Sequence, residues 1–384
     1  MNKDLFLLDP EVIFLNHGSF GACPKTVFEV YQNWQRELER QPVEFLSRRI
    51  ADLLAEARTQ LAAYLGVESD EVVYFSNPTM AINMVARSLD LHPGDEVLAS
   101  DHEYGALDRT WRFICRQKGA KYIQQSIALP ITSQADVVEA FWQGVSEHTR
   151  VIFISHITSP TALVFPVEEI CQRARTAGIL TIVDGAHAPG QIQLDLNVIG
   201  ADFYAGACHK WLCAPKGAGF LFARRSIQSR LAPLVVSWGY ESEKPGPSQF
   251  IDYHEWQGTR DLSAFLSVPA AIEFQALHDW RAVRRRCHAL ASQTRARINT
   301  LTDLPAICPD SPEWYGQMFV ALLPAGVATE GLKARLYEEY RIEVPLHRWN
   351  NQPLIRVSFQ VYNDTVDTDA LLMALRELLD RRTI

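Results

Sequence analysis

The chain has 384 residues, of which 47% are hydrophobic and 21% are charged, and this is the composition of an ordinary globular protein. The net charge of −8 at pH 7 argues against nucleic acid or an anionic membrane as the main partner. The sequence has no apolar run near the roughly 18 residues of a membrane span, no signal-peptide pattern and no C-x-x-C pair among its seven cysteines, so we expect a cytoplasmic protein without structural disulfides or a metal site.

Short, β-branched apolar segments alternate with helical patterns up to about residue 225. The strand-like segments are 72–76, 95–100, 150–156, 179–185, 201–206 and 218–223. Apolar residues at helical spacing predict helices over 47–65, 79–91, 105–118, 134–148 and 166–177. Nearly continuous apolar strands that alternate with helices predict an α/β fold, with a mostly parallel sheet covered by helices on both faces.

The alternation then stops. A loop rich in Pro and Gly is expected over 240–249, and long helices are expected over about 264–300. The tail has a strand pattern at 354–362 and a helical pattern at 366–382. We therefore expect three parts, which are an N-terminal arm (1–20), a large α/β domain (21–255) and a small C-terminal α+β domain (256–384).

Polar residues gather where the predicted strands end, which in open α/β sheets is where ligands bind. They occupy positions 77–79, 101–104, 156–159, 184–187 and 208–210. Such a concentration of ionisable groups in an apolar context predicts a functional site.

Three of these positions suggest one cofactor. Thr79 begins a helix, where it either caps the helix or helps to bind an anion. Asp184 ends an apolar strand, where it either caps a loop or holds a cation. Lys210 has no acidic neighbour in sequence, which suggests an amine of lowered pKa that forms a Schiff base with a carbonyl. A phosphate site, a carboxylate for a pyridinium nitrogen and a lysine for an aldehyde together indicate pyridoxal 5′-phosphate.

The motifs "NPT" at 77–79, "DGAHAPG" at 184–190 and "HKW" at 209–211 resemble the class V aminotransferase family, within the fold-type I pyridoxal phosphate enzymes. The likeness extends over nearly the whole chain. It implies a three-layer fold, a Schiff base on Lys210, a pyridinium contact from Asp184 and His187 near the ring hydroxyl. The phosphate contacts that it implies are Asn77, Pro78, Thr79 and His209.

The resemblance also implies contacts with substrate and partner. Arg356 in "LIRVSFQVYN" would grip the substrate carboxylate, and Tyr104 rather than His102 would lie over the cofactor ring. Gly258 and Thr259 in "WQGTRD" would reach the phosphate of a neighbouring subunit, so a homodimer is expected. Asn16 and His17 either touch substrate or belong to a structural turn, whereas Lys216 is expected to be structural or solvated.

The segments "FLNHGSFGACP" at 14–24 and "SHITSPTALVFPVEEI" at 155–170 resemble isopenicillin N epimerase and its relatives. This implies an amino-acid epimerase or racemase, with Tyr104 or His17 as the second acid. A C–S lyase acting on a cysteine derivative and an aminotransferase are alternatives, and a non-catalytic homodimer is disfavoured by the intact motifs.

Three positions depart from the cysteine desulfurase pattern. The loop 344–356 lacks the cysteine of desulfurases, which disfavours a persulfide mechanism. Ala207 replaces a hydroxyl residue expected at the phosphate, and Thr158 replaces an asparagine.

Overall fold

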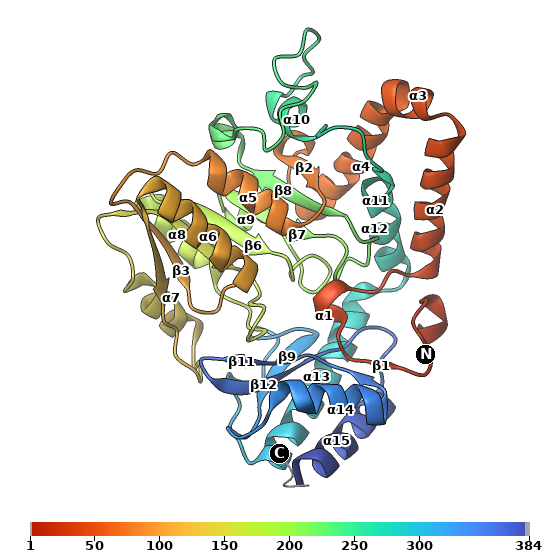
Figure 1. Cartoon of the computed structure of the whole chain (residues 1–384), viewed down its shortest axis with the longest axis vertical. Coiled ribbons are helices and arrows are strands. Elements are labelled where there is room, and N and C mark those ends of the chain that lie inside the picture. Colours follow the sequence, from red (N-terminus) through yellow and green to blue (C-terminus); the bar gives the residue numbers. More distant parts are fainter. Residues whose placement is uncertain (1, 381–384) are drawn as a thin grey trace.

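A computed structural model describes residues 2–380. Figure 1 shows a large body built on a seven-stranded sheet and a smaller body, blue in the figure, that carries the C-terminal strands and helices. The strands of the large sheet are β2 (Val72–Phe75), β3 (Glu96–Ser100), β4 (Lys121–Gln125), β5 (Thr149–Ser155), β6 (Leu180–Gly185), β7 (Phe203–Ala207) and β8 (Gly219–Ala223).

The order of strands in this sheet is β2-β8-β7-β6-β5-β3-β4. The five strands from β7 to β4 run parallel, and β8 is antiparallel to both of its neighbours, β7 and β2. The mostly parallel sheet expected from the sequence is thus confirmed. Its carboxyl edge gathers the ends of β3, β5, β6 and β7, where the polar residues of the predicted site follow.

Helices cover both faces of the sheet because alternate side chains of each strand point to opposite faces. In β2, Val73 and Phe75 belong to one apolar cluster, which includes residues of α5 and α6, while Val72 and Tyr74 belong to another, which includes residues of α4, α8 and α12. The helices of the large body include α2 (Lys25–Arg40), α4 (Ile50–Leu65), α5 (Pro78–Ser88), α6 (Gly105–Lys118), α7 (Gln134–Trp142), α8 (Val167–Thr176), α10 (Gln249–His254), α11 (Ser263–Leu266) and α12 (Val268–Leu277). Short helical segments include α1 (His17–Phe20), α3 (Pro42–Glu44) and α9 (Leu196–Ile199).

The smaller body has a three-stranded antiparallel sheet in the order β11-β12-β9. Its elements are α13 (Trp280–Thr302), β9 (Met318–Leu322), α14 (Thr329–Tyr340), β10 (Ile342–Glu343), β11 (Leu346–Trp349), β12 (Gln352–Ser358) and α15 (Thr365–Asp380). The N-terminal arm joins this body, because β1 (Ile13–Phe14) pairs in parallel with β10. Figure 1 shows α1 lying between the two bodies.

The structure differs from the predicted elements in a few places. The strand β4 was missed because it is a half-buried edge strand with the polar sequence KYIQQ. The expected helical region 264–300 is divided into α11, α12 and α13, and Asp279, with φ of 43°, interrupts it and caps α13. Among residues 2–380 no helix is both long and apolar enough to cross a membrane.

Candidate active site

A tight loop between β7 and β8 holds Lys210 at the carboxyl edge of the sheet. The backbone amide of Cys213 donates to the Lys210 carbonyl at 3.0 Å. The 184–190 loop packs directly on this turn, since a Cβ atom at Gly190, whose φ is +87°, would lie 2.2 Å from the Trp211 carbonyl oxygen. The loop packing therefore fixes the backbone from which the Lys210 amine extends.

The Lys210 amine lies beside a histidine whose tautomer the structure determines. Lys210 Nζ is 3.3 Å from His187 Nε2, and the indole N–H of Trp211 donates to His187 Nδ1 at 3.2 Å. Because an indole can only donate, Nδ1 is an acceptor, and the hydrogen of the neutral ring is on Nε2. An N–H that faces Nζ suits a neutral amine, which can accept, and not an ammonium group, which can only donate.

Burial and charge also favour the neutral amine. Burial is the largest cause that lowers the pKa of Lys210 from 10.5 to about 8; the Arg356 guanidinium lowers it further, and the Asp184 carboxylate opposes the shift. Burial lowers the pKa of His187 well below 6.5, so that its ring stays neutral. A neutral lysine amine is the nucleophile that adds to an aldehyde.

Asp184 lies at the end of β6, next to the strand that leads to Lys210. Its side chain is buried, and Oδ1 accepts a hydrogen bond from the Ala186 amide at 2.9 Å. Burial raises the pKa of Asp184, and the Ala186 amide and the Lys210 charge oppose this effect. A carboxylate in such a place is stabilised by a cation, such as the protonated ring nitrogen of pyridoxal phosphate.

The helix start expected to bind phosphate begins before Thr79. Asn77 is the N-cap of α5, with Oδ1 accepting from the Met80 amide at 2.9 Å, and Pro78 is the first helical residue. The capping role considered for Thr79 thus belongs to Asn77. Within residues 2–380 the half-buried Thr79 hydroxyl forms no side-chain hydrogen bond, so it is available to an anion near the positive end of the helix dipole.

His209, also expected at the phosphate, has one ring nitrogen engaged. Its Nδ1 donates to the Ala218 carbonyl at 3.0 Å, and burial is the main cause that lowers its pKa to about 4. The neutral ring therefore offers Nε2 as an acceptor. Because a phosphate oxygen is also an acceptor, a hydrogen bond between Nε2 and the phosphate requires a proton on one of these two atoms. Ala207, which is buried in β7, contributes no hydroxyl donor here.

Arg356 is part of β12 in the smaller body and is held by two serines. Its Nη1 donates to the carbonyl and hydroxyl oxygens of Ser159 at 2.7 and 3.2 Å, and its Nη2 donates to Ser19 Oγ at 3.1 Å. Its Nε is buried and has no hydrogen-bond partner among the described residues. An unpaired buried N–H costs free energy, and a substrate carboxylate is the group that would satisfy it. Burial lowers the pKa of Arg356 to about 10, which leaves it charged at neutral pH.

The structure distinguishes between the two aromatic candidates at 102–104. Tyr104 occupies the N-cap position of α6 without a side-chain hydrogen bond to the helix, and it is 44% exposed. His102 is fully buried, with hydrogen bonds to Thr161 Oγ1 at 2.7 Å and to the Ile127 carbonyl at 2.8 Å. The preference for Tyr104 over His102 therefore has a physical basis.

His17 has a structural position beneath the Lys210 loop. It is fully buried, with Nε2 bonded to the Lys210 carbonyl at 3.0 Å and Nδ1 bonded to the Tyr362 hydroxyl at 2.8 Å. Burial is the largest cause that lowers its pKa to about 3. Contrary to the expectation from the sequence, His17 in this position cannot contact a substrate or act as the second acid.

Asn16 is connected to Arg356 through Ser19. Its Nδ2 donates to Glu343 Oε1 at 2.9 Å, and its Oδ1 accepts from the Ser19 hydroxyl, which in turn contacts Arg356. Asn16 therefore orients Ser19, and Ser19 helps to orient the guanidinium. The sequence did not assign this role to Ser19 or Ser159, although Ser159 is among the polar residues 156–159 that follow a predicted strand and Ser19 lies within the segment "NHGSFG".

Glu103 is a further buried residue that was missed. Its two carboxyl oxygens accept from Ser100 Oγ at 2.5 Å and from Ser155 Oγ at 2.6 Å, which links the ends of β3 and β5. Burial raises its pKa from 4.5 to about 8, and the nearby Asp184 charge adds to that rise. The sequence places this acid just after a predicted strand, but only Tyr104 was chosen there as a functional residue.

The segment expected to serve a neighbouring subunit lies between α10 and α11. Thr259 is exposed, and no heavy atom lies within 4 Å of the place where a Cβ atom at Gly258 would stand. Neither residue forms a hydrogen bond with Lys210 in the described part of the chain, and their contact with a partner remains a prediction. Lys216 donates to the Gly21 carbonyl at 3.0 Å, as suits the structural role expected for it.

Taken together, the donor set fits pyridoxal phosphate. It offers an amine of lowered pKa for the aldehyde, a buried carboxylate for the ring nitrogen and a helix start for the phosphate. The unpaired Nε of Arg356 adds a place for a substrate carboxylate.

Comparison with known proteins agrees with this geometry. The model of a family described as aminotransferase class-V matches residues 22–371. Isopenicillin N epimerase of Amycolatopsis lactamdurans is 39% identical, with 97% of this chain and 96% of that protein covered. The protein of the same name from Streptomyces clavuligerus is 37% identical with the same coverage. A probable L-cysteine desulfhydrase, chloroplastic, of Arabidopsis thaliana is 29% identical, with 97% of this chain and 84% of that protein covered.

Solved structures show the same fold at lower identity. The apo structure of a cysteine desulfurase from Thermococcus onnurineus NA1 has a TM-score of 0.84 at 20% identity, with 98% and 97% of the two chains covered. A lysine variant of C-DES, in which glycine is covalently linked to the pyridoxal phosphate cofactor, has a TM-score of 0.82 at 21% identity, with 96% and 97% covered. The chain belongs to the aminotransferase class-V family and is a pyridoxal phosphate-dependent enzyme with the fold-type I architecture.

Proposed function

We propose that the enzyme inverts the configuration at the α-carbon of an amino acid, as an epimerase similar to isopenicillin N epimerase. The observation that carries this proposal is the placement of Lys210, whose Nζ lies 3.3 Å from His187, beside the strand that ends in the buried Asp184, together with a buried Arg356 whose Nε is unpaired among the described residues. The proteins named isopenicillin N epimerase, at 39% and 37% identity over 97% of the chain, support the same assignment.

Each residue has a defined task in this proposal. When bound, pyridoxal phosphate supplies an aldehyde that condenses with amines and a ring that accepts the electron pair of the α-carbon. Lys210 holds the aldehyde in the resting enzyme, and its amine, once free, takes the α-proton. Asp184 keeps a proton on the ring nitrogen, and Arg356 fixes the substrate carboxylate.

Inversion also needs a proton donor on the opposite face of the α-carbon. Of the two residues considered for this task, His17 is enclosed by protein, whereas Tyr104 is 44% exposed at the start of α6, just after the carboxyl end of β3. We therefore assign the second proton transfer to Tyr104.

A C–S lyase that eliminates a thiol from a cysteine derivative is the second candidate, because a probable L-cysteine desulfhydrase is 29% identical over 97% of the chain. It would use Lys210 in the same way, and Tyr104 would protonate the leaving sulfur. Transamination, the third alternative, differs only in where the proton returns.

One experiment separates these reactions. The holoenzyme is incubated in heavy water with amino acids of both configurations and with cysteine conjugates, and the products are examined by chiral chromatography and mass spectrometry. We expect inverted amino acid that carries deuterium at the α-carbon, and none with Lys210→Ala. Pyruvate with free ammonia would instead establish the lyase, and an oxo acid formed with amination of the cofactor, without release of ammonia, would establish the transaminase.

A further inference from the structure

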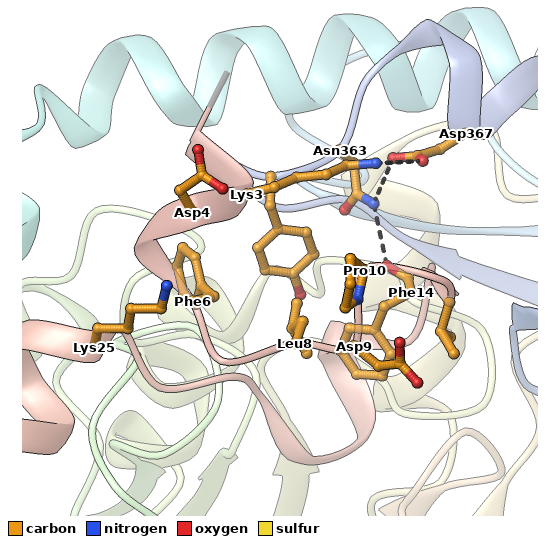
Figure 2. A pocket seen from close by; sticks show the side chains of 12 residues that line it. Lys3, Asp4, Phe6, Leu8, Asp9, Pro10, Phe14, Lys25, Asn363 and Asp367 are labelled. Atoms are coloured by element: carbon orange, nitrogen blue, oxygen red, sulfur yellow. Dashed lines mark hydrogen bonds and ion pairs between the residues drawn. The ribbon is translucent and has the colours of Figure 1, made fainter.

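A cavity of about 240 Å³ lies between the N-terminal arm and the start of α15. Figure 2 shows the side chains that line it, including Phe6, Leu8 and Phe14 of the arm, and Tyr362 is also part of the lining. A network of hydrogen bonds and an ion pair closes one side, in which Lys3 Nζ and Asn363 Nδ2 both donate to Asp367 at 3.0 Å. None of the residues assigned to the active site lines this cavity.

The walls suit a small apolar group. Phe6, Phe14 and Tyr362 supply aromatic surface, and Leu8 and Val12 supply aliphatic surface. A dry cavity of about 150 Å³ is already large enough to bind benzene. The volume available here therefore accommodates one ring or one branched aliphatic side chain.

The charges at the cavity suit a zwitterion. Of its five charged side chains, three have an ion-pair partner within the protein: Lys3 pairs with Asp367 at 3.0 Å, and Asp9 lies 3.8 Å from Arg341, which is outside the cavity. Lys25 and Asp4 also line the cavity, and neither forms an ion pair with another described residue. One unpaired ammonium and one unpaired carboxylate complement the carboxylate and ammonium of a free amino acid.

The cavity is connected to the active-site lysine through two hydrogen bonds. Tyr362, whose ring lines the cavity, bonds through its hydroxyl to His17 Nδ1 at 2.8 Å, and His17 Nε2 bonds to the Lys210 carbonyl at 3.0 Å. Because a carbonyl only accepts, Nε2 carries the ring hydrogen, and the Tyr362 hydroxyl is the donor to Nδ1. A shift of the Tyr362 ring therefore acts on the backbone that presents Lys210.

We propose that this cavity is an effector site that binds a free amino acid with an apolar side chain, and that occupancy alters the cofactor environment through Tyr362 and His17. The apolar side chain lies among Phe6, Phe14 and Tyr362, its carboxylate faces Lys25 and its ammonium faces Asp4. This site is separate from the reaction proposed above, and its binding test does not depend on which reaction the enzyme catalyses.

The test uses holoenzyme in which borohydride has fixed the cofactor to Lys210, so that an added amino acid cannot replace the lysine. L-Phenylalanine is titrated into this protein by calorimetry. We expect saturable binding that Lys25→Met and the cavity-filling Val12→Trp each weaken by about tenfold or more, the effect of losing one charge-assisted contact or the space itself. Lys118→Met, a change at an exposed lysine of α6, serves as the control and should bind like the wild type. Thermal unfolding of every variant shows whether it is folded.

The coupling is read from the fluorescence of the reduced cofactor. L-Phenylalanine should change this emission in the wild type, and Tyr362→Phe should bind the amino acid but show no change. Absence of binding would overturn the proposal, as would binding that Arg356→Lys removes and Val12→Trp leaves intact, because the amino acid would then occupy the active site. Binding without any change of emission in the wild type would disprove the effector role.

Discussion

At Lys210, two charges of opposite sign act on one amine. Burial contributes most to its lowered pKa of about 8, the Arg356 guanidinium lowers the value further and the Asp184 carboxylate raises it. The contacts of Trp211 and Lys210 with His187 place an N–H against the amine, which is the arrangement expected for its neutral form. The residues around Lys210 therefore make the neutral, nucleophilic form of its amine available at a pH well below 10.5, the ordinary pKa of a lysine.

We predict that the rate at which apoenzyme takes up pyridoxal phosphate rises with pH and has a midpoint near 8, because only the neutral amine adds to the aldehyde. Asp184→Asn should move this midpoint down, since it removes the carboxylate that favours the ammonium form. Arg356→Gln should move it up, since it removes a repelling cation. Stopped-flow absorbance over pH 6–10 gives the three midpoints, and shifts of the same sign in both variants would contradict the electrostatic account.

The depressed pKa also has a consequence for the stability of the apoenzyme. Between pH 8 and 10.5 the unfolded chain binds a proton at this lysine and the folded chain does not, so this group makes the folded state more stable as pH rises through that range. In Lys210→Met this contribution to the slope should be absent, which denaturant unfolding at several pH values would show.

Ser19 is predicted to position Arg356 for the substrate carboxylate, since its hydroxyl accepts from Nη2 at 3.1 Å. Ser19→Ala removes one hydrogen bond to a charged group, and we expect KM for the amino-acid substrate to rise about tenfold while kcat changes little. Steady-state kinetics measure the two values separately. Ser47→Ala, at an exposed serine, is the control, and an unchanged KM in Ser19→Ala would show that Ser159 alone holds the guanidinium.

At the scale of elements, some strands and strand ends could be predicted from the sequence and others could not. The buried strand β6 and the Asp184 that ends it were predictable, because a wholly apolar run followed by an acid is a local signal. The edge strand β4 was not, because its polar residues carry no such pattern. The link from His17 to Lys210 joins positions that are far apart in the sequence, and no local pattern reports a contact of that kind.

Glu103 shows how two elements depend on one buried acid. It joins the ends of β3 and β5 through Ser100 and Ser155, and burial raises its pKa to about 8. Between pH 4.5 and 8 the folded chain keeps a proton that the unfolded chain has lost, so this group makes the protein less stable as pH rises through that range.

We predict that Glu103→Gln, whose side chain cannot ionise, lacks this contribution to the pH dependence of the free energy of unfolding. Relative to the wild type, its free energy of unfolding should increase as pH rises from 5 to 8, by about 1 kcal/mol or more because each unit of pKa shift corresponds to about 1.4 kcal/mol. Urea unfolding at pH 5, 6.5 and 8 provides the measurement. Parallel curves for the two proteins would mean that Glu103 is ionised in the folded state.

At the scale of the molecule, the candidate site is assembled from three parts of the chain. Lys210 comes from the large body, Arg356 from the smaller one and Ser19 from the arm, and β1 of the arm pairs with β10. Gly21, the residue that follows the arm, packs closely against the lysine loop, because a Cβ atom at Gly21, whose φ is +71°, would lie 2.0 Å from the His209 carbonyl oxygen. Motifs in the sequence indicated the parts separately, whereas their joint packing required the three-dimensional structure.

The exposed Thr259 and the open space at Gly258 leave room for a fourth contribution, from a neighbouring subunit. If Thr259 of one protomer serves the phosphate of the other, Lys210→Ala and Thr259→Glu should each inactivate the enzyme, the latter by placing a carboxylate beside the phosphate. Thr59→Glu, at an exposed threonine of α4, is the control and should stay active. In a mixed dimer, one site would carry both changes and the other neither.

Mixing the two inactive variants under conditions that allow subunit exchange should therefore restore activity, to about a quarter of the wild-type value if exchange is statistical, because half of the dimers are mixed and each has one intact site. Sedimentation shows whether the dimer forms, independently of activity. If Thr259 served the site of its own chain, every site would retain a defect and mixing would restore nothing. Recovery of activity on mixing therefore tests the placement of Thr259, and a monomer in sedimentation would refute it directly.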